Sequence, residues 1–250
     1  MARVRKVGRR RVLSSVRVHR RVTAVAFGPN GPIVVTRPTL SLAVAPRTKR
    51  VARGFADGSV TIGGRGRPAQ VLPAKGPGVT ALGFSRDEKL LATGDAKGFV
   101  RLRDLSTGRV LRTFPAHEAA ITSVMFSPNG KLLLTASVDH EARIWNVHGR
   151  LQRVIRWHFG PLRGAAFSPD GRWVVTAGPS TAGVGSALTG RRPFFLRGPT
   201  DPLIGAAFAG RDGQTIVTAS KDGTIRVYRC EICGGIDELL LLAKRRLRSG

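Results

Sequence analysis

Short apolar runs separated by turn residues recur along the chain. The clearest run is Ile121-Thr-Ser-Val-Met-Phe126, and related runs end at Phe27, Phe84, Phe167 and Phe208. With a weaker copy at Leu42-Ala-Val44, the run ends fall at residues 44, 84, 126, 167 and 208, so consecutive copies stand 40 to 42 residues apart. A constant period of this length predicts a repeated supersecondary unit.

Each repeat predicts four short β-strands. The recurring run precedes a turn such as Ser127-Pro-Asn-Gly130, in which proline fixes φ and glycine accepts a positive φ. Alternating or β-branched stretches follow, as at 132–136 and 142–147, and a fourth lies at 110–114 of the preceding unit. Asp-Gly pairs such as Asp222-Gly223 favour tight hairpins. Four antiparallel strands in about 41 residues are typical of one blade of an all-β propeller.

These features resemble the WD-repeat β-propeller family, in a bacterial-type form, over residues 9–229. The resemblance implies a buried, hydrogen-bonded tetrad of side chains in the best copy of the repeat, formed by His117, Ser137, Asp139 and Trp145. Its implied role is structural, because each buried polar group would satisfy another and fix the blade.

The repeats predict about six blades, of which five are clear and one is degenerate. The run that ends at Phe27 fits either a fragment of a blade or a long insertion within one. The last blade has only three strands, at 202–208, 214–219 and 223–229. We expect residues 10–17 to add as its outer strand and close the ring, because a closed ring leaves no open sheet edge.

Beyond the propeller, we expect a basic lead at 1–8 and a C-terminal segment at 230–250. A short amphipathic helix is predicted at 236–247, with acids in its first turn and bases in its last. Cys230 and Cys233 form a lone CxxC before it. Zinc would need two further ligands and a redox motif would need a βαβ context, so a packed or incidental thiol pair is the favoured interpretation.

The charge of the chain is strongly unbalanced. Lys and Arg number 42 against 15 Asp and Glu, which gives a formal net charge of +27, and the first acidic residue is Asp57. Arginine binds phosphates and carboxylates bidentately, but a solvated basic surface explains the same composition. With an aromatic content of 6%, any nucleic-acid contact should be mainly to phosphates and not to stacked bases.

Cations replace the tetrad in the third blade. Counting from Phe84 places Lys75, Asp95, Lys97 and Arg103 at the four tetrad positions, and one carboxylate cannot compensate three cations in a buried site. One interpretation is a degraded, solvated blade in which Asp95 pairs with Lys97. The sharper hypothesis is a patch that binds an anion or an acidic partner, with these candidate residues: Lys75, Lys97, Arg103, Arg20, Arg21, Arg163 and Lys221.

No Ser/His/acid or paired-carboxylate arrangement recurs in one place, so we expect no enzyme activity, no cofactor and no metal site. No apolar run approaches the roughly 20 residues of a membrane-spanning helix, and two cysteines cannot staple a fold of this size. We therefore expect a soluble cytoplasmic protein, and membrane-surface binding by the basic tail is the less favoured interpretation.

The family resemblance implies a non-enzymatic scaffold that binds a protein partner through one face of the propeller. The alternative is a basic propeller that binds the phosphates of RNA, DNA or another polyanion, as the net charge of +27 indicates. Binding to nonspecific RNA and DNA at two salt concentrations would separate these two hypotheses.

Overall fold

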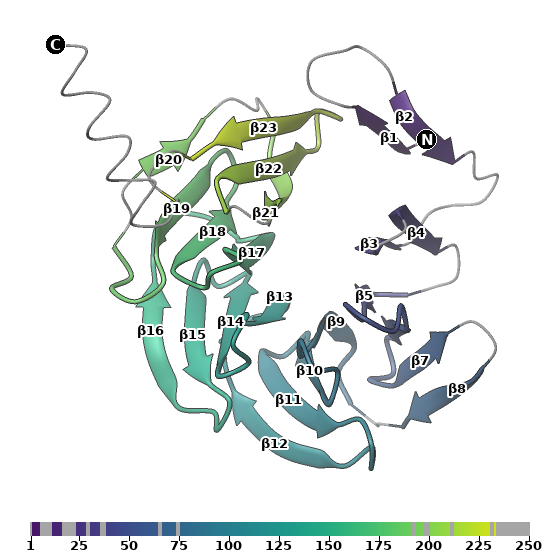
Figure 1. Cartoon of the computed structure of the whole chain (residues 1–250). Helices are drawn as coiled ribbons and strands as arrows, with labels where there is room; N and C mark the ends of the chain where they lie inside the picture. The colour runs from purple at the N-terminus through teal and green to yellow at the C-terminus, as the bar shows by residue number, and fades with distance from the viewer. Residues whose placement is uncertain are drawn as a thin grey trace, which may run out of the picture.

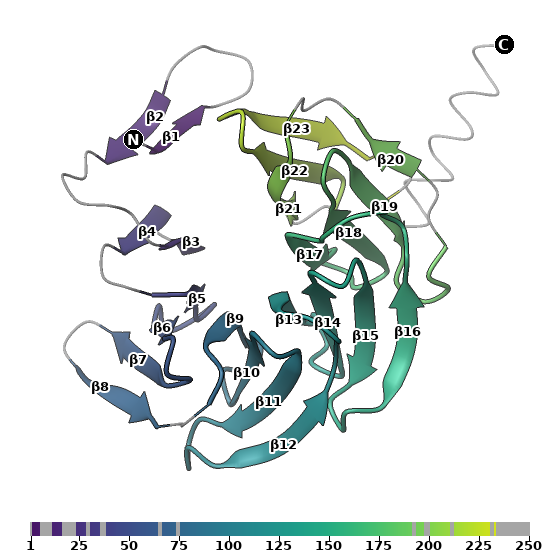
Figure 2. The same ribbon diagram turned by 180° about the vertical axis from the view of Figure 1, so that it is seen from behind.

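The computed structural model describes residues 39–64, 67–73, 76–191, 194–197, 201–210, 213–230 and 233, together with the strands that lie between residues 2 and 35. These residues form seven antiparallel sheets, of which four have four strands, one has three and two have two. The sheets follow one another in chain order around a common centre, as both ribbon views show (Figure 1, Figure 2). The expected all-β propeller of four-stranded antiparallel blades is confirmed.

The strands have the following bounds. The four-stranded sheets are β5 to β8 (Ser41–Val44, Val51–Gly54, Val60–Gly64, Arg67–Leu72), β9 to β12 (Val79–Phe84, Leu90–Asp95, Phe99–Asp104, Val110–Pro115), β13 to β16 (Ile121–Phe126, Leu132–Ser137, Ala142–Asn146, Leu151–Ile155) and β17 to β20 (Gly164–Phe167, Trp173–Ala177, Ala182–Ser186, Phe194–Leu196). The last blade holds β21 to β23 (Leu203–Ala209, Thr215–Ser220, Ile225–Arg229). The short sheets pair β1 with β2 (Ala2–Arg5, Val12–Val16) and β3 with β4 (Ala24–Gly28, Gly31–Val35).

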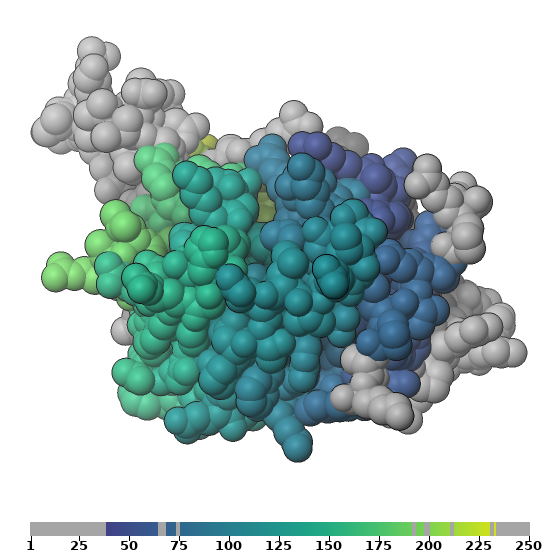
Figure 3. Space-filling model, turned by 90° about the horizontal axis from the view of Figure 1, so that it is seen from below, coloured from purple at the N-terminus to yellow at the C-terminus, as the bar shows by residue number. Residues whose placement is uncertain are grey.

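The innermost strands hold the blades together. β5, β9, β13, β17 and β21 surround the centre, and each contacts the next, while β8, β12, β16 and β20 form the perimeter (Figure 1). Apolar side chains fill the space between neighbouring blades, as where Val100 and Leu102 cluster with Ile121 and Leu133 of the following blade. The edge-on view shows side chains of successive blades meeting in chain order (Figure 3). The alternation in the sequence therefore buries one blade face against the next.

The turn chemistry of the repeat forms as the sequence predicts. Gly130 has a φ of 72° and Gly171 a φ of 75°, a conformation that glycine adopts without a steric penalty. In the first of these turns, the Ser127 hydroxyl donates to Asn129 Oδ1 over 2.7 Å and accepts the Leu132 N–H over 2.9 Å. These bonds set the register between the first and second strands.

The N-terminal part of the chain corrects one expectation and decides between two alternatives for another. β2 pairs with β1, and among the residues that the structure describes the last blade has three strands, so the prediction that residues 10–17 form its outer strand is wrong. Only a short connection separates β1 from β2, and such local pairing costs less loop-closure entropy than pairing with the far end of the chain. The run at Phe27 is a two-stranded fragment, β3–β4, with β1–β2 as a further small sheet. The predicted helix at 236–247 lies outside the described residues.

Candidate functional site: blade networks and the central cavity

A chain of hydrogen bonds crosses the blade β13–β16. Trp145 Nε1–H donates to Thr135 Oγ1 over 3.0 Å, and Thr135 Oγ1 lies 2.7 Å from His117 Nε2. His117 Nδ1 lies 2.8 Å from Asp139 Oδ2. The network joins the loop before the first strand, the second strand, the turn after it and the third strand, so it fixes all of these segments relative to one another.

The protonation of this network follows from its geometry. Burial lowers the pKa of His117, although the Asp139 carboxylate opposes this change, so the ring is neutral at pH 7. A carboxylate only accepts, so Nδ1 carries the hydrogen and Nε2 accepts the Thr135 hydroxyl. Burial alone would raise the pKa of Asp139, but its bonds to His117 and to the Glu141 and Glu118 N–H groups outweigh burial, and the pKa is lowered.

The network contains Thr135 where the sequence prediction placed Ser137. The Ser137 hydroxyl instead donates to the carbonyl oxygens of Ala119 and Ala120, at 3.1 and 2.9 Å, and accepts the Asp139 N–H. A signal for the threonine was available, because a buried threonine recurs at the same register of the second strand in four blades. These residues are Thr93, Thr135, Thr176 and Thr218.

The blade β17–β20 fills the same space with a different tryptophan. Register places Gly185 at the position of Trp145. A Cβ atom added to Gly185 would lie 2.5 Å from Trp157 Cη2, and one added to Gly183 would lie 3.0 Å from Trp157 Cε3. The Trp157 ring, which follows β16, therefore lies across both glycines, and its Nε1–H donates to the Gly190 carbonyl over 3.0 Å. His158 Nε2 lies 2.9 Å from Thr176 Oγ1, so the His–Thr link is retained.

The blade β9–β12 does not form the expected patch. Asp95 is fully buried and pairs with Arg101, whose Nη1 lies 2.6 Å from Asp95 Oδ2, so the expected Asp95–Lys97 side-chain pair is wrong. Lys97 contributes only its N–H to this carboxylate. Arg103 occupies the position of Trp145 at the far end of β11 from Lys97, so strand length separates the two cations.

Arg103 is a buried cation with incomplete hydrogen bonding. Its exposed fraction is 7%, and its Nε has no hydrogen-bond partner among the described residues. Burial lowers the pKa of Arg103, and the charge of Arg101 adds to this effect. The last blade has a similar departure, because Tyr228 stands at the Trp145 position and donates to the Arg197 carbonyl over 3.3 Å, while the buried Thr218 hydroxyl lacks a partner in the described chain.

Two other predicted cations do meet, at the start of the innermost strands. A cavity of about 310 Å³ there is lined by Arg163, Lys221, Thr80, Thr122, Ala120, Ile121 and Ile204. Thr80, Thr122, Arg163 and Ile204 are the second residues of four copies of the recurring run, so the propeller brings one repeat position together from four blades. We call this site the central cavity.

The cations of the central cavity face solvent. Arg163 and Lys221 are both exposed, and no ion pair within the described chain involves either side chain. The Thr80 and Thr122 hydroxyls donate to the Gly94 and Ala136 carbonyls, at 3.3 and 3.1 Å, which leaves their oxygen atoms able to accept. The site therefore offers positive charge beside apolar side chains. Of the other candidates, Lys75, Arg20 and Arg21 lie outside the described residues.

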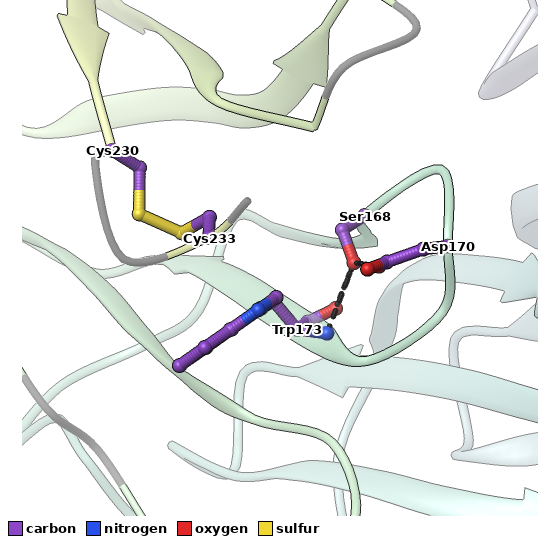
Figure 4. Close-up of a disulfide and its surroundings, with 5 residues drawn as sticks. All are labelled: Ser168, Asp170, Trp173, Cys230 and Cys233. Carbon is purple, nitrogen blue, oxygen red and sulfur yellow. Dashed lines mark hydrogen bonds between the residues drawn. A yellow bond between two sulfur atoms is a disulfide. The ribbon is translucent and has the colours of Figure 1, made fainter. Parts of the chain in front are cut away.

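The two cysteines form a disulfide, which corrects the expected pair of thiols. Cys230 and Cys233 are both buried, with their Cα atoms 5.3 Å apart. They belong to the apolar cluster between the last two blades, beside Trp173 and close to the turn that carries Ser168 (Figure 4). A CxxC spacing closes a small loop, so the bond fixes the end of β23 and does not staple distant segments. The cytoplasmic location stays a prediction.

The family description WD domain, G-beta repeat, matches residues 66–104, 108–146, 149–182 and 191–229, which together make up more than half of the chain. The chain belongs to the WD-repeat family. Each matched segment begins with or just before the outer strand of one blade and continues into the next blade, as 108–146 does with β12 and then β13 to β15. Each sequence repeat therefore contributes strands to two neighbouring blades, so the chain itself joins those blades covalently. No curated protein matches this WD-repeat chain.

WD-repeat domains are in general non-enzymatic scaffolds for protein interactions. In the described part of this chain, no group of three or more His, Cys, Asp or Glu side chains is arranged to hold a metal ion. The same residues include no helix that is long and apolar enough to cross a membrane.

Proposed function

We propose that this WD-repeat protein is a non-catalytic scaffold that holds an acidic segment of a protein partner at the central cavity. The observation that carries the proposal is the exposed pair of Arg163 and Lys221, which have no ion-pair partner among the described side chains. Carboxylates from a partner would give these cations charge-assisted hydrogen bonds.

The apolar lining favours a peptide over a nucleic acid. Ile204 lines the central cavity beside the cations and is 55% exposed, so it offers apolar surface to a partner. An aliphatic side chain of a partner would bury this surface, whereas a phosphate backbone would leave it exposed. Binding of nucleic acid through the overall charge of +27 is the competing function.

The experiment compares two fluorescent probes by anisotropy, over a salt series from low to about 300 mM. One is the peptide Glu-Leu-Glu-Leu-Glu-Leu, and the other is a nonspecific single-stranded RNA. We expect the peptide to bind, with a weak salt dependence, and to keep measurable affinity at about 150 mM salt. The proposal is wrong if the RNA binds more tightly at that salt, with the steep slope of counterion release, while the peptide does not bind.

A further inference from the structure

A second cavity, of about 580 Å³, opens between the blades β13–β16 and β17–β20. The turns Gly171–Trp173 and Ala187–Leu188 line it, so it lies at the strand ends opposite the central cavity. Leu132 and Ile144 form its wall on the preceding blade, and Leu188 at its rim is 77% exposed. We call this site the side cavity.

The preceding blade interface shows what fills such a space. There the Phe114 ring packs against Trp145, with ring centroids 5.1 Å apart, and lies against the turn at Gly149, where an added Cβ would be 3.0 Å from Phe114 Cδ1. At the side cavity, Ile155 stands one repeat after Phe114. The turn glycine, Gly190, has only the Val154 carbonyl and the Arg153 stem within 4 Å of an added Cβ. The Phe114 ring thus has no counterpart beside Gly190, although Trp157 lies elsewhere in this interface and Trp173 forms part of the side cavity's wall.

Two arginines line the side cavity, and one of them already has a carboxylate partner. Arg153 and Arg172 both line it, and no Asp or Glu does. Arg153 Nε donates to the Leu188 carbonyl over 2.8 Å, and Arg172 Nε lies 2.7 Å from Asp170 Oδ2 in the same turn. Each guanidinium is held in place by one of its nitrogen atoms, and its remaining N–H groups can bind a carboxylate.

We propose that the side cavity binds one aromatic side chain of an acidic partner segment, with flanking carboxylates on Arg153 and Arg172. The ring would pack against the apolar walls of the side cavity, as the Phe114 ring packs at the preceding interface. The arginines would bind acidic residues that flank the aromatic residue in the partner. This site is separate from the central cavity and does not depend on the function proposed for it.

The test uses two labelled peptides, Glu-Asp-Phe-Asp-Glu and the same peptide with Ala in place of Phe, measured by anisotropy with the full chain. We expect the Phe peptide to bind about tenfold or more tightly, because burial of a phenyl ring contributes that much. Ala187→Phe, which fills the side cavity from within, should remove this preference. Equal affinity of the two peptides for the unmodified chain would show binding by net charge alone and overturn the proposal.

A matched pair of surface variants covers the case in which Ala187→Phe fails to fold. Leu188→Glu places a carboxylate at the rim beside Arg153, and Leu151→Glu makes the same change at an exposed leucine outside the lining. We expect the first variant to weaken binding of the Phe peptide about tenfold more than the second. Equal weakening by both would contradict a local site.

Discussion

The blades β13–β16 and β17–β20 have the same strand order and the same register between their second and third strands, yet they are fixed by different side chains. In the first, Trp145 on the third strand reaches Thr135. In the second, Gly185 stands at that position and Trp157, from the connection before the blade, lies across it. In these two blades the same space therefore holds an indole ring that comes from two different segments of the chain.

The largest effect is expected from Trp145→Ala. The change removes a buried ring that packs on Phe114 and leaves the Thr135 hydroxyl with one partner fewer, so unfolding free energy should fall by about 3–5 kcal/mol. Chemical denaturation followed by circular dichroism measures this loss. A loss below about 1 kcal/mol would mean that the ring does not fill a packed space.

Trp157→Ala tests whether the second tryptophan replaces the first. Because the ring covers Gly183 and Gly185, its removal should open a cavity and cost about 2–4 kcal/mol, less than Trp145→Ala since Trp157 is only half-buried. The same denaturation assay applies. An unchanged denaturation midpoint would show that Trp157 does not fill a packed space and does not replace Trp145.

Thr135→Val and Thr176→Val remove the hydroxyl at one repeat position from each blade. Thr135 serves two side chains, His117 and Trp145, so its loss should cost about 2–3 kcal/mol, whereas Thr176→Val should cost about 1–2 kcal/mol. Valine keeps the shape, so packing is controlled within each variant. If Thr176→Val proved the more damaging, the network in β13–β16 would not be the stronger one.

A smaller effect is expected from pH. The folded pKa of His117 is lowered, so the unfolded chain binds the proton first as pH falls below the ordinary histidine value near 6.5. Stability contributed by the neutral ring is full above that pH and is lost below it, by at most about 1.4 kcal/mol per pH unit. In His117→Gln, the melting temperature should fall less between pH 7 and 5.5 than it does in the unmodified chain. An unaltered slope would place the titrating group elsewhere.

The strand pattern was predictable because it depends on local properties. Period-two alternation and the Pro and Gly turns lie within single repeats, and the constant spacing of runs such as Ile121–Phe126 can be counted along the sequence. Thr135 was also predictable, although the family resemblance implies Ser137 for this role. The signal for Thr135 is the buried threonine that recurs, in four blades, two residues before the position of Ser137.

Other features depend on contacts between repeats and could not be read from one repeat. Trp157 can lie where it does because Gly183 and Gly185 of a later strand leave space for its ring, and the sequence around Trp157 does not indicate this. Arg163 and Lys221 meet because the innermost strands surround one centre, whereas Lys97 and Arg103 are neighbours in sequence but stand at opposite ends of β11. The predicted ring closure fails for a similar reason. β2 pairs with β1 and not with the last blade, and the sequence of β2 alone does not show which of the two partners it prefers.

At the central cavity, Arg163 and Lys221 are proposed to bind a partner without contributing to the stability of the fold. The most direct measurement is the affinity of Arg163→Thr with Lys221→Val for the peptide Glu-Leu-Glu-Leu-Glu-Leu. Thr80, Thr122 and Val138 already hold these positions in other blades, so the melting temperature should stay unchanged while affinity falls about tenfold or more. Arg112→Thr with Lys131→Val, two exposed cations outside the lining, removes equal charge as the control and should leave affinity nearly intact. Equal loss in both pairs would show that binding depends on net charge and not on Arg163 and Lys221.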